Sequence, residues 1–332
     1  MPQHIANINK TGNPFRKAKE SHLPGRYVFP FFSVLLLFVA FPFNVSAQKP
    51  AKTWDREFHP PVVCTLPKEV DETSGLIFWR NSLWTHNDSG GLPVIYRLDT
   101  LTGRILQRIR LKNATNRDWE DISQDKKYIY VGDIGNNSGN RHDLCIYKVK
   151  KSDIPQQGDG EVTAVKIAYA YPDYKGPVKN RKHNNFDCEA LLASGDSLYL
   201  FSKDWQDQQS RLYALPKKAG KYTARPVSQY NVKGLVTGAD KQPKTGTVML
   251  VGYTRGNWVP FVMVLSGYKG HNFFSGQKER VRLKNAKATQ TEGVAFGNGN
   301  RVYLSSEGRP PVFKQTLYVL PLDSIFQKRE RK

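Results

Sequence analysis

Cysteine is scarce in this chain. Only Cys64, Cys145 and Cys188 occur among its 332 residues. Three cysteines allow at most one disulfide bond within the chain, and no two of them have the spacing of a zinc site. A disulfide-rich fold is therefore excluded, zinc is not indicated, and we expect the cysteines to be small buried strand residues.

Several other patterns are missing. Past residue 60, no long segment has the 3.6-residue periodicity of an amphipathic helix. The serines show neither a nucleophile-elbow pattern nor an obvious catalytic triad, and no glycine-rich segment has the form of a phosphate-binding loop. These absences argue against a helical fold, a serine hydrolase and a P-loop nucleotide-binding protein.

Acidic residues are outnumbered. The chain has 29 acidic and 50 basic side chains, which gives a formal net charge of +21. This excess favours polyanionic neighbours such as a membrane surface, an acidic glycan or a phosphorylated ligand, unless it only solvates strand faces and loops. The basic residues are scattered rather than grouped in a recognisable binding motif, so we expect no nucleic acid partner.

The N-terminal segment has the pattern of an export signal. A basic leader ends at Arg26, residues 27–47 carry no charge, and small residues precede a plausible cleavage point before Gln48. We predict a signal peptide at 1–47 and a periplasmic or extracellular protein, which contacts the membrane only through that signal. An uncleaved N-terminal membrane anchor is the alternative, but Pro30 and Pro42 shorten its apolar core.

The remaining chain repeats. We read residues 48–60 as a linker, 61–325 as a β-propeller and 326–332 as a basic tail. Short aromatic and β-branched runs between Gly, Asn and Asp turns predict strands, and they recur in five similar groups. The first strands of these groups open at Glu72–Leu76, Asp118–Ile122, Asp187–Leu191, Val236–Asp240 and Gln290–Val294. Repeating four-stranded units are typical of propeller blades.

The number of blades follows from the spacing. Five blades is the direct count, with a long insertion at 172–185 between the second and third repeats. Six blades, one of them degenerate, is the alternative. The fifth repeat lacks a clear fourth strand after Leu320, and Pro61–Leu66 supplies one. We therefore predict an all-β, single-domain propeller whose ring is closed by this N-terminal strand.

Acidic residues recur where the first strand begins and the second ends. In a propeller these two positions share one mouth of the central channel, so the carboxylates there must be protonated, paired or bound to a cation. Ca²⁺ takes six to eight oxygen ligands. We predict a calcium site formed by Asp88, Glu120, Asp133, Glu189, Asp204, Glu292 and Glu307. The fourth repeat departs from the pattern, with Gly238 and Tyr253 in the two places.

Neighbouring residues complete the predicted site. His86 is the candidate general base. The predicted ligand-binding residues are Glu72, Asn87, Arg117, Asp118, Asn136, Asn137, Arg141, Asp187, Lys203 and Tyr253. The opposing interpretation needs no metal. Asp and Asn are ordinary turn formers, and Arg117, Arg141, Lys203 and Arg255 are basic enough to pair the acids.

Several of these motifs occur together in a known order. Glu72–Leu76, Asn87–Gly90, Ile95–Asp99, Gly103 and Asp118–Ile122 make the chain resemble the SdiA-regulated family of exported bacterial β-propellers. It is more distantly similar to esterase-like phytase and calcium-dependent phosphotriesterase or lactonase propellers. The resemblance implies a propeller with an acidic, calcium-binding channel mouth.

Two functions fit these observations. The first is a monomeric exported propeller that binds an envelope or extracellular ligand, such as a small anion or a glycan. The alternative is a calcium-dependent hydrolase of phosphoesters or lactones, in which His86 is the base and Arg117 or Arg141 steers the anion. The fold alone does not decide between them.

Overall fold

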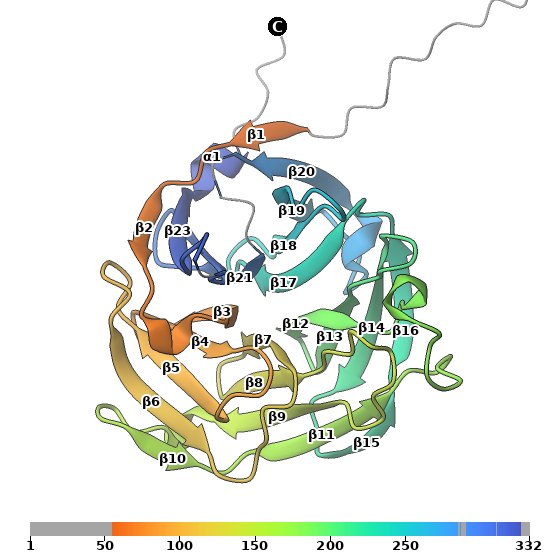
Figure 1. Cartoon of the computed structure of the whole chain (residues 1–332), viewed down its shortest axis with the longest axis horizontal. Helices are drawn as coiled ribbons and strands as arrows, with labels where there is room; N and C mark the ends of the chain where they lie inside the picture. Colours follow the sequence, from red (N-terminus) through yellow and green to blue (C-terminus); the bar gives the residue numbers. More distant parts are fainter. Residues whose placement is uncertain (1–54, 285, 287–289, 310, 327–332) are drawn as a thin grey trace, which may run out of the picture. The chain divides into compact units, whose positions relative to one another are not determined.

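A computed structural model describes residues 55–284, 286, 290–309 and 311–326. The predicted export signal, most of the predicted linker and residues 327–332 lie outside the described residues. The described chain forms a ring of sheets (Figure 1). We call the axis that the inner strands surround the central channel. Within the part of the chain that the structure describes, no helix has the length and apolar character needed to cross a membrane.

Five antiparallel blades make up the ring, which confirms the predicted five-bladed propeller. From the channel outward, the first blade contains β3 (Thr73–Trp79), β4 (Ser82–Asn87), β5 (Val94–Leu98) and β6 (Ile105–Leu111). The second contains β7 (Trp119–Gln124), β8 (Tyr128–Asp133), β9 (Cys145–Lys150) and β11 (Val165–Ala170). The third contains β12 (Cys188–Ser194), β13 (Ser197–Ser202), β14 (Ser210–Pro216) and β16 (Arg225–Tyr230).

The last two blades complete the circle. The fourth contains β17 (Leu235–Lys241), β18 (Val248–Tyr253), β19 (Pro260–Ser266) and β20 (Gln277–Leu283). The fifth contains β21 (Thr291–Phe296), β22 (Arg301–Ser306) and β23 (Thr316–Pro321). Its fourth strand is β2 (Val62–Thr65), which pairs antiparallel with β23. The predicted closure of the ring by an N-terminal strand is therefore confirmed, and it removes a free sheet edge.

Three short strands extend blades from outside. Strand β1 (Arg56–Phe58) pairs in parallel with β20, β10 (Gly160–Val162) with β6, and β15 (Gly220–Thr223) with β11. Each comes from a segment of chain outside the blade that it joins. Strand β1 lies inside the range that the sequence suggested as a linker. These strands tie neighbouring parts of the ring together.

The apolar core lies between the blades. Trp84 of the first blade and Trp119 of the second are fully buried in one shared cluster. The tyrosine repeated in four third strands packs in the same way, and its copies Tyr96, Tyr147, Tyr213 and Tyr318 are all buried. The helices are single turns or little more: Lys68–Val70, Lys151–Asp153, Arg181–His183, Phe273–Ser275 and α1 (Leu322–Phe326).

Every inner strand carries a β-bulge close to its start. The pairing register of β7 with β8 shifts between Trp119 and Asp121, so Glu120 is the extra residue. The same shift isolates Glu189, Thr237 and Glu292 in their blades. The repeat alignment had placed Gly238 opposite these glutamates, and the register corrects this position to Thr237. In the second, third and fifth blades the bulge turns a glutamate toward a common region.

Candidate functional site

Three glutamates share the bulge position in three blades. Glu120, Glu189 and Glu292 are only 3 %, 3 % and 2 % exposed. A glutamate is poorly suited to the interior of a regular strand, but the extra residue of a bulge lies outside the ladder and is free to point elsewhere. The repeated bulge therefore explains why buried carboxylates recur here.

The carboxylates form two overlapping groups. Oxygen atoms of Asp88, Asp118 and Glu120 all lie within 4.8 Å of one another, and so do those of Glu120, Asp187 and Glu189. Asp88 follows β4, Asp118 precedes β7 and Asp187 precedes β12. Strand ends from three consecutive blades therefore bring distant parts of the sequence to one end of the channel.

Two glutamates of the fifth blade, Glu292 and Glu307, interact with each other and with an acid of the first blade. Gln290 Nε2 donates to Glu292 Oε1 at 3.0 Å and to Glu307 Oε2 at 3.1 Å. Charge interactions connect Glu292 and Glu307 with Asp88 of the first blade. The acidic mouth is therefore defined as Asp88, Asp118, Glu120, Asp187, Glu189, Glu292 and Glu307.

Burial and mutual repulsion favour the protonated acids. Burial, followed by the charges of neighbouring carboxylates, raises the pKa of Glu120 well above its ordinary value. The same causes raise the pKa of Asp88 to about 7 and that of Asp118 to about 6. Glu292 and Glu307 each reach a pKa of about 8. Without a cation, part of the acidic mouth is protonated at neutral pH.

Lys203 supplies one positive charge inside this group. Its side chain is buried, and its Nζ donates to Glu189 Oε2. Although burial opposes the charge, Glu189 and other acidic neighbours hold the pKa of Lys203 well above its ordinary value. The rings of Trp205 and Tyr253 each lie 5.2 Å from the ammonium nitrogen. One ammonium group offsets only part of the charge of so many carboxylates.

Asp187 and Glu189 are already occupied by protein donors. Asp187 Oδ1 accepts from the Asn136 amide at 2.7 Å, and its Oδ2 accepts from Trp205 Nε1 at 2.7 Å. Glu189 is paired with Lys203. This group of carboxylates therefore has few oxygen lone pairs left for a further ligand.

The group made by Asp88, Asp118 and Glu120 differs. Asp88 Oδ1 and Glu120 Oε1 are buried and accept no hydrogen bond within the described residues. Asp118 Oδ2 lies 3.9 Å from Arg141 Nη1, which is longer than a hydrogen bond. Buried polar atoms without partners are rare in folded proteins and call for an explanation. The side-chain amide oxygens (Oδ1) of Asn87 and Asn137 are also buried without a hydrogen-bond partner.

Gly135 makes room for these oxygens. A Cβ atom at this position would overlap Glu120 Oε1 and Asp118 Oδ2. The carbonyl oxygen of Gly135 accepts from Arg141 Nη1 at 2.7 Å, so the backbone is fixed beside the carboxylates. The absence of a side chain lets the two acids approach this turn.

Asp133 and Asp204 are held by arginines instead. Asp133 Oδ1 accepts from Arg141 Nη2 at 2.7 Å, and Asp204 pairs with Arg211. Lys203 and Asp204 follow β13 and have different partners, since Lys203 pairs with Glu189 and Asp204 with Arg211. Neither Asp133 nor Asp204 belongs to the two groups of carboxylates whose oxygen atoms lie within 4.8 Å of one another. Asp133 still adjoins the acids, because its Oδ1 also accepts from the Asp118 amide at 3.2 Å.

His86 lies between the first two blades. Its ring is fully buried, stands edge-on to Trp119 at 5.6 Å, and hydrogen-bonds through Nδ1 with the Asn87 carbonyl at 2.9 Å. Burial lowers the pKa of His86 to about 4, so the ring is neutral at physiological pH. The imidazole ring of His86 is therefore not accessible to solvent in this structure.

The other predicted ligand-binding residues serve varied contacts. Arg117 is exposed and pairs with Asp143. Asn136 links the Phe186 carbonyl and the Arg141 amide through its side chain. Tyr253 is buried and stacks on Trp258 at 4.9 Å. Glu72 is exposed, and its carbonyl accepts from the Asp88 amide at 2.9 Å.

Sequence reasoning overlooked Asp121, which lies inside the channel. Its Oδ2 accepts from the amides of Leu191 at 2.7 Å and Ala239 at 3.2 Å, and its Oδ1 accepts from the Ile122 amide at 2.8 Å. One carboxyl group therefore connects the inner strands β7, β12 and β17. The only sequence signal was an acid directly after the bulged Glu120.

Comparisons with known proteins add little on function. No family model and no curated protein matches the sequence. Among solved structures, the PQQ-bound aldose sugar dehydrogenase of Streptomyces coelicolor is 14 % identical, with a TM-score of 0.48, over 79 % of this chain and 99 % of that one. An exo-β-1,3-galactanase of Phanerochaete chrysosporium with galactose is 13 % identical, with a TM-score of 0.48, over 81 % and 65 %. Similarity at this level says nothing about what this chain binds, and membership of the SdiA-regulated family stays a prediction.

Proposed function

We propose that this protein is an exported propeller whose acidic mouth binds a divalent cation, calcium first, through Asp88, Asp118 and Glu120. The observation that carries the proposal is the close approach of their oxygens, within 4.8 Å, while Asp88 Oδ1 and Glu120 Oε1 are buried without a hydrogen bond. The export pattern of residues 1–47 supports calcium, which is abundant outside the cytoplasm. The resemblance of the sequence motifs to the SdiA-regulated family also implies a calcium-binding channel mouth.

The chemistry of the donor set fits calcium. Ca²⁺ is a hard cation that binds carboxylate, amide and carbonyl oxygens, and the described mouth offers the first two kinds. No thiol or imidazole is among the three residues, so softer metals gain nothing there. A bound divalent ion would also stabilise the ionised form of the buried carboxyl groups, so they would no longer need to be protonated.

A calcium titration tests this function. Protein dialysed against EDTA should bind calcium and rise in Tm by about 5 °C at 100 times the Kd, because a ligand at that excess stabilises by about 2.7 kcal/mol. Glu120→Gln should lose both the binding and the shift. Glu161→Gln removes an exposed acid on β10 and should behave like the wild type. Equal responses of the two variants, or no response of the wild type, would refute the proposal.

We infer that the mouth binds an envelope or extracellular ligand, either a small anion or a glycan. Arg117, which directly precedes Asp118 and pairs with Asp143 at the surface, is a candidate basic group for such an anion. The hydrolase alternative has less support, because its proposed base His86 is fully buried. We therefore expect no calcium-dependent turnover of phosphoesters or lactones, and turnover that Glu120→Gln abolishes would favour the hydrolase.

A further inference from the structure

A cavity of about 810 Å³ lies at the opposite mouth of the channel. Its lining includes the ends of all five inner strands, at Phe78, Gln124, Ser194, Lys241 and Phe296. The acidic mouth lies at the starts of the same strands. At about 3.3 Å per residue, an inner strand separates the two mouths by about 20 Å.

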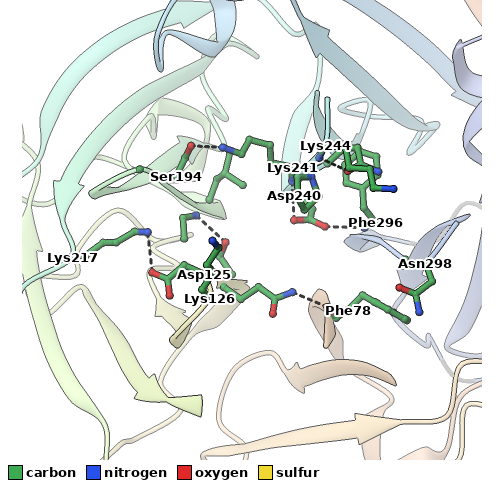
Figure 2. A pocket seen from close by; sticks show the side chains of 18 of the residues that line it. Phe78, Asp125, Lys126, Ser194, Lys217, Asp240, Lys241, Lys244, Phe296 and Asn298 are labelled. Atoms are coloured by element: carbon green, nitrogen blue, oxygen red, sulfur yellow. Dashed lines mark hydrogen bonds and ion pairs between the residues drawn. The ribbon is translucent and has the colours of Figure 1, made fainter. Parts of the chain in front are cut away.

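Four lysines line this cavity. Lys126 follows β7, Lys217 follows β14, Lys241 ends β17 and Lys244 lies in the turn after it. Figure 2 shows these side chains coming from different sides around the cavity. We call this end the basic mouth (Lys126, Lys217, Lys241 and Lys244). Its charge is opposite to that of the acidic mouth.

The two carboxylates of the cavity are engaged by protein donors. Asp125 Oδ2 accepts from Lys217 Nζ at 3.0 Å and from Tyr130 at 2.7 Å. Asp240 accepts from the amides of Phe296 at 2.8 Å and Lys241 at 2.7 Å (Figure 2). Burial raises the pKa of Asp240 to about 7. Two acids, one of them partly protonated near pH 7, do not neutralise four lysines.

Lys241 shows the resulting imbalance most directly. Its Nζ donates to the neutral hydroxyl of Ser194 at 2.6 Å (Figure 2). Burial, followed by the charge of Lys217, lowers the pKa of Lys241. The exposed Lys126 and Lys244 form no ion pair among the described residues. An anion placed between these groups would relieve their repulsion and gain charge-assisted hydrogen bonds.

The rest of the lining is compatible with a sugar. Phe78, which stacks on Tyr303, and the largely buried Phe296 add aromatic side chains, and Gln124, Gln242 and Asn298 add amide groups. Aromatic faces with a few polar groups are typical of small-ligand sites, and the volume lies within the usual range of about 300–1,000 Å³. Long polyanions, in contrast, are usually bound along open surface grooves.

We propose that the basic mouth binds an anionic sugar, one that carries a phosphate or carboxylate group, with the anion held between Lys217 and Lys241 and the ring against Phe78 and Phe296. Neither the calcium site nor its ligand is required for this binding. The two sites lie at opposite mouths and share no residue.

Isothermal titration at low salt, in the presence of EDTA, tests the site. The probes are glucose 6-phosphate, glucuronate, neutral glucose and inorganic phosphate. We expect the first two to bind, and whichever binds more tightly identifies the anionic group. Glucose and inorganic phosphate should each bind at least about tenfold more weakly, because each lacks half of the interactions. Inorganic phosphate binding as tightly as both sugars would overturn the proposal.

A pair of double variants with equal charge locates the binding. Lys217→Gln with Lys241→Gln should weaken sugar binding by about tenfold or more. Lys112→Gln with Lys221→Gln removes two exposed lysines outside the cavity lining and should leave the affinity within about twofold. Equal losses in both double variants would show attraction by net charge alone and would overturn the site.

Two further variants address a failure to fold and the independence of the two mouths. If the cavity double variant fails to fold, Lys126→Gln replaces an exposed side chain and should still weaken binding severalfold relative to Lys112→Gln. Glu120→Gln should bind the sugar as the wild type does, even though it loses calcium. A loss of sugar binding in Glu120→Gln would contradict the independence of the two mouths.

Discussion

Asp121 joins three blades through a single side chain. Its carboxyl oxygens accept hydrogen bonds from the backbone amides of Ile122, Leu191 and Ala239. The backbone of Gly75 in the first blade is also close, since a Cβ there would clash with Asp121. At this position a polar residue is part of the structural core of the ring, because it supplies acceptors that no apolar side chain could replace.

Asp121→Ala should therefore destabilise the propeller severely. Three buried amides would lose their acceptor, at about 1–3 kcal/mol for each unsatisfied group. Asp121→Asn keeps one acceptor oxygen and should cost less. Urea unfolding measures both, with the exposed Asp159→Ala as the control. A free energy of unfolding for Asp121→Ala equal to that of the control would show that the amides find other partners.

Gly135→Ala probes the space beside the proposed calcium ligands. The new methyl group would occupy the place of the Glu120 and Asp118 oxygens, so the carboxylates must move apart and calcium affinity should fall about tenfold or more. Gly91→Ala is the matched control, because its Cβ would meet nothing closer than 3.8 Å. Calcium titration compares the two. If Gly135→Ala bound calcium with wild-type affinity, the cation would not be bound beside this turn.

At the scale of elements, the sequence predicted the regular parts of the propeller. Repeated aromatic and β-branched runs indicated the four-stranded blades, and Pro61–Leu66 was correctly assigned to close the ring as β2. The bulges were not visible, because one extra residue changes which side chains face the channel without changing composition. Counting along the sequence grouped Asp133 and Asp204 with Asp88 and Glu307. In the structure Asp133 pairs with Arg141 and Asp204 with Arg211, and their part in a cation site stays a prediction.

Short strands and the basic mouth were missed for related reasons. Strands β1, β10 and β15 have three or four residues, too few to show a pattern, and their partners lie in other blades. The basic mouth collects lysines from turns far apart in the sequence. In a single sequence such lysines look like ordinary solvated turn residues, and only the ring brings them together.

Closure by β2 leads to a prediction for truncated chains. A chain that begins at residue 61 loses β1 and keeps β2, whereas a chain that begins at residue 67 loses both and leaves β23 as an open edge. Exposed edges promote aggregation. We expect the shorter chain to unfold less cooperatively and to aggregate, as measured by thermal unfolding and light scattering. If both chains melted alike, β2 would not be what holds the ring closed.

At the scale of the whole molecule, the propeller separates opposite charges along one channel. The acidic mouth gathers carboxylates that burial and repulsion keep partly protonated, and the basic mouth gathers lysines around a cavity. The formal net charge of +21 is a sum over the whole chain and does not reveal this separation of charge. We expect the proposed cation at the acidic mouth and the proposed anionic sugar at the basic mouth to bind at the same time without competition, because the two sites share no residue.

The protonated acids of the acidic mouth predict how stability depends on pH. Glu292 and Glu307 have pKa values of about 8 in the folded protein, against 4.5 for an ordinary glutamate. Between these pH values the unfolded chain has released protons that the folded protein still holds, so a rise in pH favours unfolding. This contribution is complete below pH 4.5 and is lost as the pH rises through 8.

In EDTA, urea unfolding should therefore give a lower free energy for the wild type at pH 8 than at pH 6. Glu292→Gln does not titrate at this position, so its decrease over the same range should be smaller. Calcium should flatten the wild-type decrease, because a bound cation stabilises the ionised carboxylates that higher pH produces. Glu161→Gln, which alters an exposed acid, should keep the wild-type slope. A Glu292→Gln slope as steep as that of the wild type would mean that Glu292 is already ionised in the folded protein.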